Sequence, residues 1–389
     1  MINYEMSLPT RLIYGKGRAS EAGAFLKEYT DSILFVYGGG SVKKTGLYDT
    51  VVNSLKENNI AFKELSGVPS NPDIAFVRKG IAIVKENNIS FIFGVGGGSV
   101  IDVCKAIAAG ALYDGDPWDF FSGTRINAAL PVGDILTIPG TGSESSLNTV
   151  ISNNTTKEKV GIASRFLRPV FSIMDPELCV TIPKHAIASP VFDMLSHTME
   201  RYFSETEHTD TTDGIAKAVM RSIIKNGTAA YEDPSDVDAW GELMLASDYS
   251  HNELTGFGKK HDWANHGMEE VISGIYGIPH GAGLAVVTLA WMKYVYEKHI
   301  PIFVQFAVNV MGIRGHLHEP KRVAEDGIKA LEKWVKGMNL PTHLSEFNIT
   351  DEYFELMAER ACSYHRRKMI GSLEELKPED IVNIYRIAQ

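Results

Sequence analysis

The chain has 389 residues, 44% of them hydrophobic and 22% charged, and its formal net charge is −10 at pH 7. This length exceeds the usual size of one hydrophobic core, so the composition predicts a globular protein with two domains. The acidic balance and the lack of a long Lys/Arg cluster argue against nucleic acid or a membrane as a partner.

The cysteines and the chain start favour a cytoplasmic protein. The three cysteines are scattered and contain no CxxC pair, so no disulfide framework is expected and a reducing compartment fits best. The first residues lack a basic segment followed by an apolar run, so no signal peptide is predicted. The longest apolar stretch, residues 281–291, is too short to cross a bilayer and is predicted to form a buried helix.

Strand and helix patterns alternate in the first half of the chain. Buried strands are predicted at 32–37 and 91–95, a short strand at 61–65 and a further strand at 134–138. Helices are predicted between them, where apolar residues recur at helical spacing, at 47–59, 74–88 and 100–111. The repetition of strand, loop and helix predicts a parallel sheet with helices on its faces.

The pattern changes near residue 183. Successive amphipathic helices follow, broken by Gly, Pro and Asn, among them 215–224, 239–254, 302–310 and 320–337. Strand alternation of comparable quality is absent from this half of the sequence. The sequence therefore predicts an α/β domain over residues 1–182 and an all-helical domain over residues 183–389.

Two glycine-rich loops end predicted strands in the first domain. Residues 97–99 (Gly-Gly-Ser) precede the helix at 100–111, and residues 38–41 (Gly-Gly-Gly-Ser) follow the strand at 32–37. Glycines let the backbone approach a pyrophosphate, and a helix N-terminus supplies N–H donors. Glycines also serve tight turns, and the first loop matches the GxGxxG pattern imperfectly. The presence of two such loops in one parallel sheet favours a dinucleotide site.

A third polar turn, 139–144, follows the strand at 134–138. Thr141 and Ser143 offer hydroxyl groups there that could bond a nicotinamide or a phosphate. A capped turn without a ligand is the alternative for this segment.

Four side chains in the second half predict a metal site. Asp193 and His197 stand four residues apart on a predicted apolar helix and therefore share one face. His266 and His280 follow in the next polar segments. One carboxylate with imidazoles is a donor set for Fe(II), Mn(II) or Zn(II) that leaves a coordination position open. The alternative is a salt-bridged aspartate and hydrogen-bonded core histidines.

The other histidines are predicted to be structural, although His261 lies close to His266. They are His185, His208, His251, His261, His299, His316, His318, His343 and His365.

The order of motifs resembles the iron-containing alcohol dehydrogenase family, in its butanol dehydrogenase and NADPH-dependent aldehyde reductase branch. The motifs are Gly-Gly-Gly-Ser-x-x-Asp-x-x-Lys (96–105), Thr-Gly-Ser-Glu (141–144), Asp-Pro-Glu-Leu (175–178), Asp-x-x-x-His (193–197) and His-x13-His (266–280). Branch marks are 37–46, 115–121 and 341–345, and the similarity runs from about residue 3 to the end of the chain.

The resemblance implies a Rossmann-like dinucleotide-binding domain and a helical domain that binds metal and substrate, with the active site in the cleft between them. It implies that Asp193, His197, His266 and His280 are the metal ligands. It also implies a homodimer or a larger homo-oligomer. The implied cofactor-binding residues are Gly38, Gly39, Gly40, Ser41, Asn71, Gly97, Gly98, Ser99, Asp102, Thr137, Thr141, Ser143 and Lys159.

Two positions depart from the family pattern. Glu270 stands where most members have a histidine four residues after the third ligand, and Pro190 stands where a glycine is usual. Proline is tolerated in a first helical turn. Glu270 is a candidate catalytic residue: an additional metal ligand, an orienting partner of a ligand histidine, or a proton relay. The structural alternative is an ion pair with Lys259 or Lys260.

Together these features predict an NAD(P)(H)-linked, metal-dependent alcohol dehydrogenase or aldehyde reductase for short-chain primary alcohols and aldehydes. Fe(II) is the expected Lewis acid, with Zn(II) or Mn(II) as alternatives. The 38–41 segment contains no acidic residue that would repel a 2′-phosphate, and Lys43 and Lys44 follow it. NADP(H) is therefore favoured, with NAD(H) as the alternative.

Two other functions remain open at this stage. A sugar-phosphate cyclase or lyase of the same fold would need basic residues converging on a phosphate, and none cluster near the predicted ligands. A nucleotide-binding protein without activity is the second alternative, and the complete ligand set argues against it.

Overall fold

The computed structural model describes residues 1–314, 319–363 and 368–389, so His316, His318 and His365 lie outside the described residues. The chain forms two compact units. One comprises Ser7–Ile182 and Pro234–Asn252, and the other comprises Met1–Met6, Pro183–Asp233 and Glu253–Gln389.

The first unit is built on a parallel sheet that has six strands within the described residues, in the order β1-β8-β5-β4-β2-β3. The strands are β1 (Arg11–Tyr14), β2 (Ser32–Tyr37), β3 (Ala61–Ser66), β4 (Ile92–Gly96), β5 (Val132–Leu136) and β8 (Phe171–Met174). The α/β prediction is confirmed, and β2 to β5 correspond to the four predicted strands. β5 lies two residues earlier than expected, because Val132 pairs with Ile92 and Leu136 already pairs with Gly96.

The sequence patterns missed the short outer strand β1, the strand β8, and the antiparallel hairpin of β6 (Asn148–Asn153) and β7 (Glu158–Ala163). β1 and β8 are each four residues long, too short to show a period on their own.

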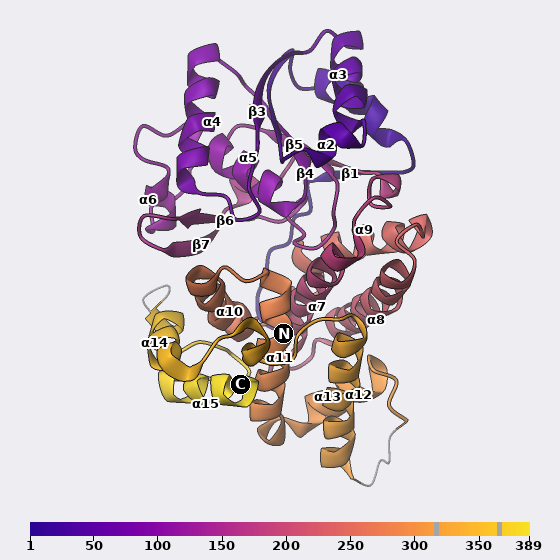
Figure 1. Ribbon diagram of the computed structural model, residues 1–389, viewed down its shortest axis with the longest axis vertical. Helices are drawn as coiled ribbons and strands as arrows, with labels where there is room; N and C mark the ends of the chain where they lie inside the picture. Colours follow the sequence, from indigo (N-terminus) through magenta and orange to yellow (C-terminus); the bar gives the residue numbers. More distant parts are fainter. Residues whose placement is uncertain (315–318, 364–367) are drawn as a thin grey trace. The chain divides into compact units, whose positions relative to one another are not determined.

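Helices cover both faces of the sheet (Figure 1). The residues Ile33 and Phe35 of β2 pack with α1 (Ala22–Lys27) and α3 (Leu47–Glu57). Leu34 and Val36 point to the opposite face, where α4 (Ile74–Asn87) and α5 (Gly98–Ala111) pack. Because side chains alternate along a strand, β2 is apolar on both faces and has no solvent-facing side.

The chain reverses its direction of sheet growth between β2 and β4. From β2 the chain continues to the edge strand β3, and it then returns to place β4 on the other side of β2. In open parallel sheets, ligands bind outside the carboxyl ends of the strands at such a reversal. The two predicted glycine loops, 38–41 and 97–99, follow these two strands.

The second unit is helical. Its longer helices are α7 (Ala188–Tyr202), α8 (Asp210–Glu232), α10 (Ala264–Tyr276), α11 (His280–Val295), α12 (Ile300–Asn309), α13 (Pro320–Gly337), α14 (Phe354–Ser363) and α15 (Pro378–Ala388). The predicted buried helix corresponds to α11, which packs against α7, α10 and α15. Helix α9 (Val237–His251) belongs to the first unit. Pro190 is the third residue of α7 and is tolerated there, as expected for a first turn.

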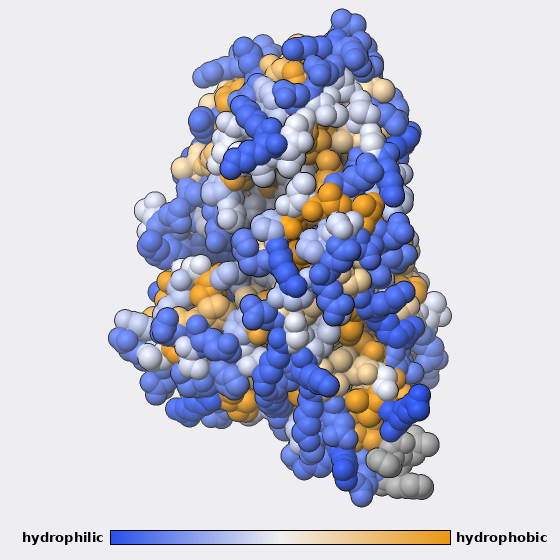
Figure 2. All heavy atoms as spheres, turned by 45° about the vertical axis from the view of Figure 1, so that its right-hand side comes forward, coloured by the Kyte–Doolittle hydropathy of each residue, from blue (hydrophilic) through white to orange (hydrophobic). Residues whose placement is uncertain are grey.

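No helix among the described residues is long and apolar enough to cross a membrane. The molecular face drawn in Figure 2 carries mainly hydrophilic residues, with smaller apolar areas between them.

Helices α7 and α11 approach closely at a glycine. A Cβ atom added to Gly281 would lie 1.9 Å from the backbone oxygen of Ser189. Backbone cannot rotate out of the way as a flexible side chain can, so this contact requires glycine. It fixes the first turn of α11 against the first turn of α7.

We therefore predict that Gly281→Ala lowers the thermal unfolding midpoint, because overpacking of this kind costs about 1–3 kcal/mol. Gly337→Ala is the matched control, since a Cβ there meets no atom within 4 Å at the exposed end of α13. Differential scanning fluorimetry of both variants checks this. Equal midpoints for the two variants would contradict the close-packing argument.

Candidate metal centre and cofactor loops

Helix α7 places an acid and an imidazole side by side in a buried position. Asp193 and His197 lie on the same face, one turn apart, and the Nδ1 atom of His197 is 3.7 Å from Oδ1 of Asp193. Both residues are buried, at 5% and 6% exposed. The sequence interval of four residues therefore gives the expected shared face.

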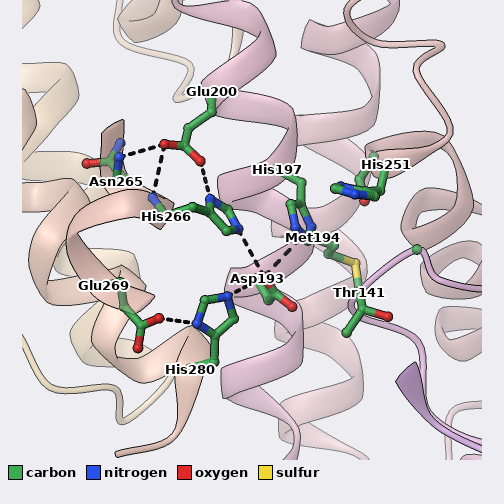
Figure 3. A network of polar contacts seen from close by, with 12 residues as sticks. Thr141, Asp193, Met194, His197, Glu200, His251, Asn265, His266, Glu269 and His280 are labelled. Atoms are coloured by element: carbon green, nitrogen blue, oxygen red, sulfur yellow. Dashed lines mark hydrogen bonds and ion pairs between the residues drawn. The ribbon is translucent and has the colours of Figure 1, made fainter. Parts of the chain in front are cut away.

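Two further histidines reach the same aspartate oxygen. The Nε2 atom of His266, near the start of α10, lies 3.7 Å from Oδ1 of Asp193. The Nε2 atom of His280, the first residue of α11, lies 3.8 Å from that oxygen. Figure 3 shows the three rings turned towards Asp193. The four predicted ligand side chains are thus brought together, although they come from three helices.

The spacing of these atoms fits a bound metal ion. Within the described residues, one ligand atom each from Asp193, His266 and His280 all lie within 4.8 Å of one another. Ligands about 2.1 Å from a tetrahedral metal are separated by about 3.4 Å from each other. Neither Oδ1 of Asp193 nor Nε2 of His266 has a hydrogen-bond partner in the described part of the chain, although both are buried. Buried polar atoms without hydrogen bonds are costly, so a cation between them satisfies both.

The electrostatics of the cluster also favour a cation. Burial alone would lower the pKa of His266, but the Glu200 and Asp193 carboxylates outweigh it and raise this pKa to about 10. A metal-free site at neutral pH therefore holds a proton where a metal would carry the positive charge.

Two glutamates contact the Nδ1 atoms of His266 and His280, and neither glutamate was predicted from the sequence. Glu200 of α7 contacts Nδ1 of His266, and Glu269 of α10 contacts Nδ1 of His280 (Figure 3). Both carboxylates are buried, at 1% and 0% exposed. Helical spacing places Glu200 on the face of His197 and Glu269 on the face of His266, but it does not indicate that each carboxylate contacts a histidine of a later helix.

Glu270 is partly exposed and lies one residue beyond the carboxylate that contacts His280. It is not a member of the ligand group found among the described residues. Lys259, one of its two proposed ion-pair partners, is buried and pairs with Asp213, and it also donates 2.8 Å to the Tyr202 carbonyl.

The predicted cofactor loops lie at the carboxyl edge of the sheet in the first unit. Residues 38–40 follow β2 and Ser41 begins the short helix α2 (Ser41–Lys44), while Gly97 is the N-cap of α5. Gly39 is exposed, and a Cβ there would meet no atom within 4 Å, so packing does not require glycine. Gly39 also has no positive φ. Close approach of a ligand to the backbone is one physical reason for a glycine at such a position.

Glycines 97 and 98 do have a packing reason. A Cβ on Gly97 would lie 2.4 Å from Cγ2 of Ile138, and one on Gly98 would lie 2.3 Å from Oγ1 of Thr141. The turn after β5 therefore packs directly on the start of α5. The tight-turn alternative accounts for these two glycines without excluding a nucleotide.

Hydrogen bonds hold several of the remaining predicted cofactor residues at the same edge. Ser99 donates 2.6 Å to the carbonyl of Ser70, beside the exposed Asn71. Asp102 accepts hydrogen bonds from the Ser143 hydroxyl at 2.6 Å and from the Val150 N–H at 3.0 Å.

Burial raises the pKa of Asp102, while Lys105 and Lys159 of β7 act in the opposite direction. The backbone N–H of Thr137 donates to the Gly96 carbonyl at 3.0 Å. The loops around residues 70, 97 and 141 are therefore in contact with one another. Asp102 holds the loop around residue 141 through its hydrogen bond with Ser143.

Comparison with known proteins gives a consistent picture over the whole chain. Residues 9–176 match the family described as iron-containing alcohol dehydrogenase, and residues 187–389 match the Fe-containing alcohol dehydrogenase family, C-terminal. NADH-dependent butanol dehydrogenase A of Clostridium acetobutylicum is 42% identical, with 99% of each chain covered. NADPH-dependent aldehyde reductase of Escherichia coli is 31% identical, with 100% of each chain covered. The crystal structure of NADH-dependent butanol dehydrogenase A from Thermotoga maritima has a TM-score of 0.95 at 36% identity, covering 100% of this chain and 99% of that one.

Proposed function

This chain belongs to the iron-containing alcohol dehydrogenase family, and we propose that it interconverts short-chain primary alcohols and aldehydes with NADP(H) or NAD(H). Family membership makes it a metal-dependent oxidoreductase that uses a nicotinamide cofactor, as its sequence motifs predicted. The predicted resemblance to the butanol dehydrogenase branch is confirmed.

The observation that carries the proposal is the convergence of three imidazoles on one buried carboxylate oxygen. We propose Asp193, His197, His266 and His280 as the ligands of one divalent ion, with Fe(II) expected from the family and Zn(II) or Mn(II) as alternatives. The donor set fits, because one charged oxygen and three neutral nitrogens suit Fe(II), which accepts more than four ligands and so keeps a coordination position open. An ion held there supplies Lewis acidity towards the oxygen of an alcohol or aldehyde, while the nicotinamide exchanges the hydride.

In this proposal, the protein side chains and loops bind the cofactor, the metal ion and the substrate and orient them for the reaction. The loops at 38–41 and 97–99 are proposed to hold the cofactor where parallel sheets bind dinucleotides. Within this proposal, residues 1–182 bind the dinucleotide and residues 183–389 bind metal and substrate. We further propose that the chain forms a homodimer, as the family resemblance implies. We also propose a cytoplasmic location, which fits its three buried and free cysteines.

We predict that His280→Ala removes both bound metal and turnover, because the site then loses one of its nitrogen ligands. Elemental analysis of the metal-reconstituted variant and an assay of aldehyde-dependent NAD(P)H oxidation measure the two effects. Mutation of the surface residue His343, which is outside the cluster, is the control. Stoichiometric metal in His280→Ala would refute the proposed ligand set.

We predict a preference for NADPH over NADH. Glu64, the acid of the adjoining strand β3, accepts a hydrogen bond from the Tyr48 hydroxyl at 2.7 Å and another from Tyr37. The Lys43 ammonium lies 4.7 Å from the centre of the Tyr48 ring, so this corner also offers a positive charge to a 2′-phosphate.

The test is the ratio of kcat/KM for the two cofactors, in wild type and in Lys43→Ala. Loss of Lys43 should lower the value for NADPH and leave that for NADH nearly unchanged. The names of the relatives include both cofactors, and a kcat/KM for NADH more than tenfold above that for NADPH would contradict the preference.

We predict that Glu270→His accelerates alcohol oxidation. Glu270 lies one turn after His266 on α10, and a carboxylate near the metal adds negative charge and weakens Lewis acidity. The test compares the steady-state rates and the metal affinities of Glu270→His and Glu270→Ala with those of the wild type. If neither variant changes either quantity, the position is structural.

A further inference from the structure

Glu200 and Glu269 make superficially equivalent contacts to the ligand histidines. Each lies on an earlier helix than the histidine that it contacts: Glu200 on α7 faces His266 on α10, and Glu269 on α10 faces His280 on α11, the next helix. In both cases one carboxylate oxygen receives the Nδ1–H of the imidazole, which leaves the Nε2 lone pair for the metal. The glutamates therefore select the tautomer that can bind an ion.

The second oxygen of each glutamate has a different kind of partner. In Glu200, Oε1 accepts from two backbone groups at the start of α10, the N–H of Asn265 at 2.6 Å and the N–H of His266 at 3.2 Å. A backbone N–H can only donate. In Glu269, Oε1 accepts from the hydroxyl of Ser273, one turn further along α10. A serine hydroxyl can rotate to accept instead.

This difference decides what glutamine does at each position. A glutamine has one oxygen and one NH₂ group in place of two oxygens. At position 200 the oxygen must face the two backbone donors, so the NH₂ group must face Nδ1 of His266. Two donors cannot face each other, so the imidazole must move its proton to Nε2, the atom that faces Asp193. At position 269 the amide can turn its oxygen to His280 and its NH₂ group to Ser273.

We propose that Glu200 is the obligatory positioning residue of the metal centre, fixing the tautomer of His266, whereas Glu269 is a replaceable one. The inference rests on the proposed function, because it takes His266 and His280 as ligands. Glu200 also ties α7 to the N-terminus of α10, so the ligands of the two helices share one fixed frame. Gly283 leaves room for Glu269, since a Cβ there would lie 2.5 Å from its Oε1.

The test compares the zinc dissociation constants of wild type, Glu200→Gln and Glu269→Gln, measured by competition with a fluorescent chelator without cofactor or substrate. Removal of an orienting partner typically weakens metal binding about 10–100-fold. We expect Glu200→Gln to weaken zinc binding at least tenfold, and Glu269→Gln to weaken it less. Glu374→Gln is the matched control, because Glu374 contacts Nε2 of His299 at 3.0 Å in a histidine–carboxylate pair outside the cluster.

A loss below tenfold in Glu200→Gln, or a loss no larger than in Glu269→Gln, overturns the proposal. Circular dichroism of the metal-free variants establishes that each is folded. If Glu200→Gln does not fold, ¹⁵N-histidine NMR of the zinc-loaded wild type replaces it. His266 must then show a protonated Nδ1, and a protonated Nε2 overturns the proposal. A wild type that binds no divalent metal instead refutes the proposed function.

Discussion

The buried carboxylate of Asp193 is the constraint on which the second unit depends. It lies on the largely buried helix α7 at 5% exposure, and its Oδ1 atom faces three imidazole rings. A buried anion needs a compensating positive charge. Without a metal, the raised pKa of His266 supplies that charge as a proton. A divalent cation can supply it in a form that also activates a substrate oxygen.

The helices are arranged so that each ligand is supported by its neighbour. Glu200 connects α7 to α10, Glu269 connects α10 to α11, and Gly281 lets α11 approach α7 at backbone distance. Three helices thereby meet around one oxygen atom. The geometry of the metal site and the packing of the helices are therefore determined by the same contacts.

In the first unit, the sheet topology determines where the glycine loops lie. Parallel strands end at one edge, and the reversal between β2 and β4 brings two glycine loops to that edge. Asp102 then holds the third loop through Ser143 and Val150. Its carboxylate accepts hydrogen bonds from these two protein groups, so in the structure it stabilises the 139–144 turn. At Gly39, neither packing nor a positive φ requires glycine.

The sequence by itself determined the periodic features of this protein. Local spacing, which acts within one element, predicts the apolar strands β2 and β4, the helices between them, and the i, i+4 pair Asp193 and His197. The family motifs added His266 and His280. Only the tertiary structure decided which buried acids support these histidines, because Glu200 and Glu269 act between helices and their partners lie 66 and 11 residues away. It also decided the places of β1, β8 and α9, since the edge on which a short strand pairs, and the unit that a helix joins, depend on contacts distant in sequence.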